Sequence, residues 1–165
     1  MTLVIGNGLS NSGTLLAKTT LSSSSASLSN TSAGTLQATQ GATITTSGAL
    51  ANSGALIVSD SASSNGTLNV ATLSNSGSGV IQSAKNLTLN LSGSTLTNAS
   101  KIVAAKSLSF NSTGSGLTLT NNASGYLQAG SVAGDTLTLG GSAVVLDNKA
   151  SAIILGDKLA FTLSR

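Results

Sequence analysis

The stretch from Leu96 to Phe110 reads LTNASKIVAAKSLSF and holds one unit of a repeat that fills the chain. It opens on a leucine, one small residue and an asparagine, passes through the apolar pair Ile102-Val103, and closes on the alternating run Leu108-Ser109-Phe110. The opening Leu-x-Asn phrase occurs seven times, and its asparagines are Asn11, Asn30, Asn52, Asn75, Asn98, Asn121 and Asn148. Subtracting successive asparagine numbers gives steps of 19, 22, 23, 23, 23 and 27 residues. A period near 20 residues predicts stacked structural units.

Each repeat divides into three short strand-like segments, in which side chains point alternately inward and outward. The first segment ends in Leu-x-Asn, the second is the apolar pair, and the third alternates strictly, as in Leu137-Thr138-Leu139. Leu3-Val4-Ile5 reads as the third strand of an earlier coil. No tight Asn-Gly turn joins two alternating runs, so each strand is expected to pair with its equivalent one coil later. We therefore predict an all-β parallel β-helix of about seven coils of 19–27 residues, a rod of roughly 34 Å at about 4.8 Å per coil.

The seven asparagines each lie two residues after an inward leucine, so period 2 points them inward at the first turn of the coil. Asparagine tolerates the left-handed conformation of a sharp turn, and stacked amides can bond to one another along the rod. A row of ligand-binding side chains is the functional alternative, but buried polar groups usually satisfy one another. We predict a structural ladder. Glycines follow most of the asparagines and fit the same turn: Gly13, Gly34, Gly54, Gly77, Gly79 and Gly125.

Composition narrows the classes of protein that fit. Only 7% of the residues are charged, and the mean hydropathy is +0.32, which excludes disorder driven by charge. The net charge of +3 is spread thinly, which argues against a nucleic-acid partner. No apolar run approaches 18 residues, so no membrane insertion is expected. Residues 1–6 lack the features of a signal peptide, so an exported form is expected to be a mature segment. The basic residues are scattered: Lys18, Lys85, Lys101, Lys106, Lys149, Lys158 and Arg165.

The phrase Leu-x-Asn-x-Gly-x-Ile-x-Ala, followed by Gly-Asp-x-Leu-x-Leu, resembles the haemagglutinin repeat of filamentous-haemagglutinin-type exoproteins. These are the secreted partners of two-partner secretion systems and the stalks of contact-dependent growth-inhibition toxins. The best-matching stretches are Leu73 to Leu91, Leu96 to Phe110 and Leu119 to Leu139. The likeness is strongest from Leu50 to Leu163, so within a single domain of residues 1–165 we expect more degenerate coils in 1–49 and regular coils in 50–165. No secretion domain or toxin domain of that family is recognisable.

The resemblance implies a right-handed β-helix in a secreted protein of the bacterial surface. Its function would be that of a structural rod, mediating adhesion or presenting a distal domain, with no enzymatic activity and no cofactor. The partners it implies are a receptor or glycan on a host or neighbouring cell and an outer-membrane transporter during secretion. The chain itself would be a segment of a longer fibre.

A repeated slot before the third strand holds a column of charges, Lys85, Lys106, Asp135 and Asp157. Lys106 and Asp135 are expected to pair across coils, worth at most about 1 kcal/mol if exposed. Asp135 and Asp157 would lie about 5 Å apart at the backbone, near the carboxyl separation of retaining glycosidases, so a polysaccharide-acting enzyme is one alternative. The absence of histidine and of an aromatic row weighs against it, and the aspartates are too few to predict a metal site. A solvated turn column is the simpler interpretation.

Two further hypotheses concern the surface and the ends of the rod. Coils without a cap expose strand edges, so a self-assembling extracellular filament, joined end to end, is a second alternative. Threonine triplets such as Thr43-Ile44-Thr45 are similar to the rows of ice-binding β-helices, but Thr88-Leu89-Asn90 breaks the row, so strand propensity explains them better. Phe110 and Phe161 occupy inward positions of the third strand and are expected to pack in the core.

Overall fold

The structure is a computed structural model that describes residues 1–162; Leu163, where the resembling stretch ends, and Arg165 lie outside the described residues. All regular structure within residues 1–162 is β-strand, and this range holds no helix that could cross a membrane. Its strands are β1 (Thr2–Asn11), β2 (Thr14–Ala17), β3 (Leu21–Asn30), β4 (Thr35–Ala38), β5 (Ala42–Thr46), β6 (Ala49–Asn52), β7 (Ala55–Ser59), β8 (Gly66–Val70), β9 (Thr72–Asn75), β10 (Val80–Ser83), β11 (Leu87–Leu91), β12 (Thr95–Asn98), β13 (Lys101–Ala104), β14 (Leu108–Ser112), β15 (Leu117–Asn121), β16 (Tyr126–Ala129), β17 (Thr136–Gly141), β18 (Val144–Asn148), β19 (Ile153–Leu155) and β20 (Lys158–Phe161).

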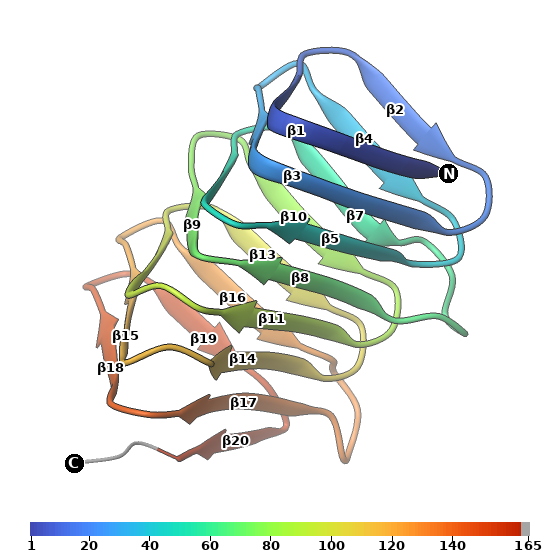
Figure 1. Cartoon of the computed structure of the whole chain (residues 1–165). Coiled ribbons are helices and arrows are strands. Elements are labelled where there is room, and N and C mark those ends of the chain that lie inside the picture. Colours follow the sequence, from blue (N-terminus) through green and yellow to red (C-terminus); the bar gives the residue numbers. More distant parts are fainter. Residues whose placement is uncertain (163–165) are drawn as a thin grey trace.

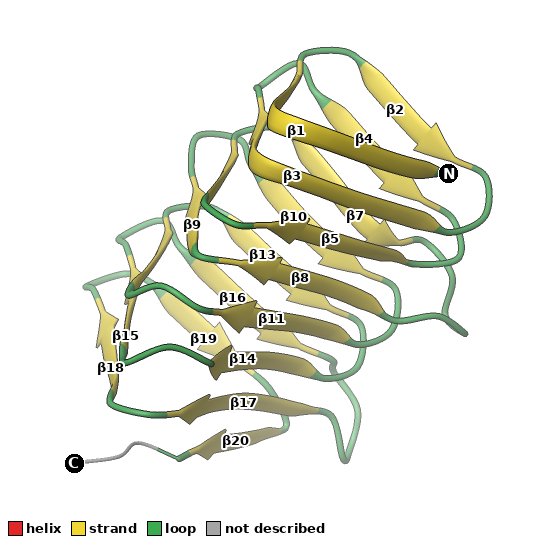
Figure 2. Ribbon diagram, in the orientation of Figure 1, coloured by secondary structure: helices red, strands yellow, loops and turns green. Residues whose placement is uncertain are grey.

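The strands stack as parallel coils, with the N-terminus and the C-terminus at opposite ends of the stack (Figures 1 and 2). Each coil contributes one strand, or part of a strand, to each of three faces. Face 1 carries the Leu-x-Asn strands: the ends of β1 and β3, then β6, β9, β12, β15 and β18. Face 2 is the seven-stranded sheet of β2, β4, β7, β10, β13, β16 and β19. Face 3 carries the alternating strands: the starts of β1 and β3, then β5, β8, β11, β14, β17 and β20.

Register follows the repeat from coil to coil. Asn30 aligns with Asn52, and Asn52 aligns with Asn75, so equivalent residues lie directly above one another. Leu3 pairs with Ser23, which places the first residues on face 3 as expected. The prediction of an all-β fold, a parallel β-helix of about seven coils, is confirmed. Right-handed winding stays a prediction of the resemblance.

The core is a stack of aliphatic side chains between the three faces. Leu50 and Phe110 are 0% exposed, as the alternation predicts. Phe161 is 38% exposed, so the prediction that it packs in the core is wrong: β20 is the last described strand of face 3, and no coil within residues 1–162 covers it. Ser23 and Ser25 occupy inward positions of β3, and their buried hydroxyls have no hydrogen-bond partner among the described residues. A buried hydroxyl without a partner weakens the core at this early coil.

Candidate functional site

The seven predicted asparagines form one hydrogen-bonded column inside the corner between faces 1 and 2, called here the inner ladder. Each Nδ2 donates to the Oδ1 of the asparagine one coil later, from Asn11 through to Asn148, over 2.8–2.9 Å. Asn52, Asn75 and Asn98 are completely buried, whereas Asn148 in the last coil is exposed. The ladder therefore runs through the whole described stack with a single direction of donation.

Backbone carbonyls accept from the remaining N–H donors of the inner ladder. Besides its bond to Asn98, Asn75 Nδ2 approaches the carbonyl oxygens of Gly79 at 3.2 Å and Lys101 at 3.1 Å. Its Oδ1 accepts from Asn52. These contacts use both N–H donors of the amide, and the side chain is completely buried, so it presents no group to a ligand from outside.

The turns that follow the asparagines have two lengths. In the short form the amide nitrogen two residues on donates to the asparagine Oδ1, as Ser100 does to Asn98 over 3.3 Å. In the long form a β-turn intervenes, as where Gly79 N donates to the carbonyl oxygen of Ser76 over 2.9 Å. Within residues 1–162 the only non-glycine residues with positive φ are Ala143 and Ser151. None of the seven asparagines has the left-handed backbone that was expected at a sharp turn. Their role in the turn depends instead on the hydrogen bonds of their side chains.

A second column of amides lies on the outer surface of face 3 and is called here the outer ladder. Asn111 Nδ2 donates to Asn90 Oδ1 over 2.9 Å, Asn90 to Asn69 over 2.8 Å, and Asn69 to Thr45 Oγ1 over 3.3 Å. All three asparagines are half-buried, and donation runs toward the N-terminus, opposite to the inner ladder. Sequence reasoning missed this column because Thr88-Leu89-Asn90 was interpreted as a broken threonine row. Its signal was an asparagine recurring every 21 residues after the inward residue of the third strand.

Beside the outer ladder, two shallow depressions of about 340 and 450 Å³ meet at Thr45, which lines both. Together they form the axial groove, which follows the bend between faces 3 and 1 and crosses successive coils. Every side chain that lines it is uncharged. The residues that mark its course are Val4, Ser24, Thr45, Asn69, Asn90 and Thr113.

The predicted charge column lies at the corner between faces 2 and 3. Lys106 N donates to the carbonyl oxygen of Lys85, which places the two lysines in neighbouring coils. Lys106 Nζ lies 3.7 Å from Asp135 Oδ1, the ion pair that the spacing predicts. The lysine side chain is 53% exposed, so the pair is worth at most about 1 kcal/mol. Lys85 Nζ instead donates to the carbonyl oxygen of Ser63 over 3.2 Å.

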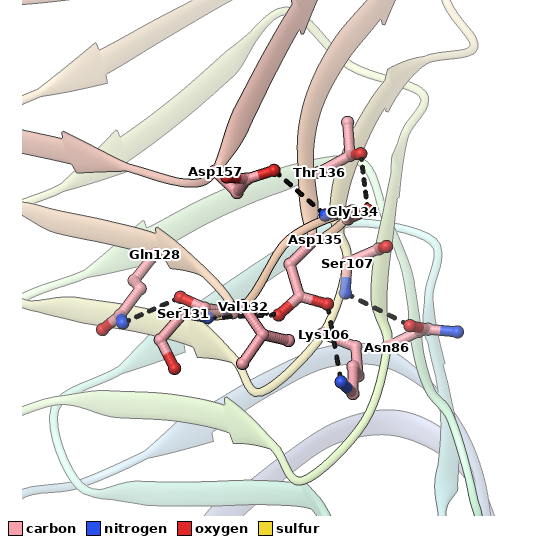
Figure 3. Close-up of polar contacts among 11 residues, drawn as sticks. Asn86, Lys106, Ser107, Gln128, Ser131, Val132, Gly134, Asp135, Thr136 and Asp157 are labelled. Carbon is pink, nitrogen blue, oxygen red and sulfur yellow. Dashed lines mark hydrogen bonds and ion pairs between the residues drawn. The ribbon is translucent and has the colours of Figure 1, made fainter.

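The two aspartates of this column hold a loop closed (Figure 3). Asp135 is buried, and its Oδ2 accepts from the amide nitrogens of Ser131 at 3.1 Å and Val132 at 3.2 Å. Asp157 Oδ2 accepts from Gly134 N over 3.0 Å. The loop of residues 130–135 falls within the 27-residue step. Both carboxylates therefore organise backbone, and residues 1–162 contain no group of three or more acidic, histidine or cysteine side chains able to hold a metal ion.

Comparison of the chain with protein-family models, curated proteins and solved structures finds no match to any of them.

Proposed function

We propose that this chain is the shaft of an exported bacterial surface protein, a structural rod that mediates adhesion or carries a distal domain outward. The observation that supports the proposal most is the unbroken inner ladder. Each coil is joined to the next by a hydrogen bond between side-chain amides inside the core and by parallel strand pairing on three faces. Repeat architectures of this kind derive their stability from the interfaces between neighbouring units, so added coils lengthen the rod without a new core.

The finer assignment rests on sequence resemblance. The phrase from Leu119 to Leu139 is similar to haemagglutinin-type repeats, which implies a two-partner-secretion exoprotein or a contact-dependent-inhibition stalk. The chain would then cross the outer membrane through a dedicated transporter and meet a receptor on another cell. The rod would have no catalytic role, which agrees with the use of Asp135 and Asp157 to bind backbone amides.

Antibodies raised against residues 1–162 test the proposal in the bacterium that encodes the chain. Intact cells or the culture medium should be labelled without permeabilisation, and deletion of the gene for the neighbouring outer-membrane transporter should abolish that labelling. A cytoplasmic protein marker controls for lysis. Labelling that requires permeabilised wild-type cells would overturn the assignment to the cell surface.

A filament subunit is the second candidate, and one observation favours it. Leu159 is 48% exposed and Phe161 is 38% exposed at inward positions of the last described coil. A further coil supplied by a second copy would cover them, and the single direction of the inner ladder would allow its amides to continue the column. Sedimentation velocity over a range of concentrations separates the two candidates. Species that grow end to end with concentration support the filament, whereas a monomer at all concentrations excludes the filament and is compatible with the shaft.

A further inference from the structure

The axial groove brings together a shallow hollow that crosses several coils and two members of the outer ladder, Asn69 and Asn90. It crosses β1, β3, β5, β8 and β11 and reaches Thr113 just beyond β14. Five steps of about 4.8 Å between neighbouring strands give it a length of about 24 Å. The hollow therefore suits an extended ligand that lies parallel to the rod axis.

The outer ladder leaves regular bonding capacity along this hollow. Asn90 donates one N–H to Asn69 Oδ1 and accepts one hydrogen bond from Asn111 Nδ2. A primary amide has two N–H groups and two lone pairs, so one donor and one acceptor of Asn90 stay unused within residues 1–162. Asn69 has the same arrangement, with Thr45 as its acceptor. Two neighbouring coils thus each present one unused donor and one unused acceptor to the groove, at the spacing of the strands.

These amides are also held in place before any ligand arrives. Bonds of 2.8 and 2.9 Å to both neighbours fix the orientation of Asn90, and the half-buried setting restricts its rotamers. Ordering a free polar side chain on binding usually costs about 0.5–1.5 kcal/mol, and a side chain that is already ordered avoids most of this cost. A preorganised row compensates for the shallowness of the groove.

The chemistry of the lining selects the class of ligand. Serine and threonine hydroxyls, the amides of Asn69 and Asn90 and a few aliphatic side chains such as Val4 line the groove, and no formal charge or aromatic ring does. Lys85, Lys106 and Asp135 lie at the corner between faces 2 and 3, outside the lining. An anionic ligand would leave its charge unpaired here, whereas an uncharged ligand rich in hydroxyls would find donors and acceptors for them. A chain that carries neutral hydroxyls at a constant interval matches the row.

We propose that the axial groove binds an uncharged linear polysaccharide whose chain runs along the rod. The proposal rests on the proposed function in one respect, since the shaft must be exposed where such glycans occur. Binding of a glycan by the purified chain does not depend on secretion. A failure to bind would therefore not contradict the proposed shaft function, and a failure of secretion would not contradict glycan binding.

Isothermal titration calorimetry of the whole chain tests it with four neutral probes: cellohexaose, chitohexaose, xylohexaose and a hexamer of β-1,3-glucose. Heparin serves as the anionic comparison. At least one neutral probe should bind with saturable heat. Asn90→Asp should weaken that binding by about tenfold or more, because a carboxylate adds charge and removes the donors. Its matched control is Gln82→Glu, which adds the same charge on the outer surface of face 2.

A second pair of variants guards against a folding defect in Asn90→Asp. Thr113 is exposed in a turn at the end of the groove, so Thr113→Lys blocks the groove without touching the core. Ala123→Lys adds the same side chain in an exposed turn between faces 1 and 2. Binding lost in Thr113→Lys and kept in Ala123→Lys supports the groove. Equal binding by both, no heat with any neutral probe, or binding to heparin alone overturns the proposal.

Discussion

The inner and outer ladders are built from the same residue with the same bond, yet they differ in what surrounds them. Both stack one asparagine per coil through Nδ2···Oδ1 bonds of 2.8–2.9 Å. Asn75 of the inner ladder is fully buried, and its two N–H donors are taken up by Asn98 and by the carbonyl groups of Gly79 and Lys101. Asn90 of the outer ladder is half-buried and keeps a donor and an acceptor toward solvent.

Burial decides what a column of side-chain amides does. In the interior an unpaired donor or acceptor costs about 1–3 kcal/mol, so a buried amide is stabilised by partners within the protein. On the surface water satisfies the remaining groups at no such cost, and a ligand can replace that water. The inner column therefore stabilises the rod, whereas the outer column is available for recognition. Three substitutions test this contrast, in order of decreasing effect on stability.

Asn75→Leu should have the largest effect. The leucine fills a similar volume but removes the partner of Asn52 Nδ2 and of Asn98 Oδ1, both buried. We expect a loss of about 2–5 kcal/mol in the free energy of unfolding, measured by circular dichroism in guanidinium chloride. A loss below about 1 kcal/mol, within the range of one ordinary hydrogen bond, would show that the inner ladder contributes little to the rod.

Gly79→Ala should have an intermediate effect, because the glycine gives the inner ladder its space. An added Cβ would lie 2.5 Å from Asn75 Oδ1 and 2.6 Å from the carbonyl oxygen of Asn52. Displacing them should cost about 1–3 kcal/mol. Gly13 occupies the equivalent place in the first coil, where an added Cβ meets nothing within 4 Å, so Gly13→Ala should be neutral or slightly stabilising. Equal thermal midpoints for the two variants would contradict the steric account.

Asn90→Leu should have the smallest effect on stability although it makes the same chemical change as Asn75→Leu. It removes two surface bonds that water can replace, so the free energy of unfolding should change by no more than about 0.5 kcal/mol. The same denaturation experiment measures it beside Asn75→Leu. Equal destabilisation of the two variants would show that burial does not explain the different contributions of the two ladders to stability.

Much of the fold could be predicted from the sequence because every coil repeats the same pattern of apolar and polar residues. Alternation in Leu87-Thr88-Leu89 and the recurring Leu-x-Asn phrase predict parallel stacking, since each unit must bury its apolar face against the next. The pairing of Lys106 with Asp135 followed from the same register. The axial groove could not be predicted, because it depends on how sharply the chain bends between faces 3 and 1 and on small residues at that bend, such as Ala26 and Ser47.

The period, the inward leucines and the alignment of Asn11 to Asn148 all follow from the amino-acid sequence, because they depend on local alternation and on a phrase that recurs in each coil. Which amides are buried and which stay open to solvent depends on the assembled coils. Carbonyl groups from neighbouring coils close around Asn75, whereas Asn90 faces outward beside a hollow. The physical reason is that exposure to water is a property of the assembled stack, and a single repeat read as a string of residues does not contain it.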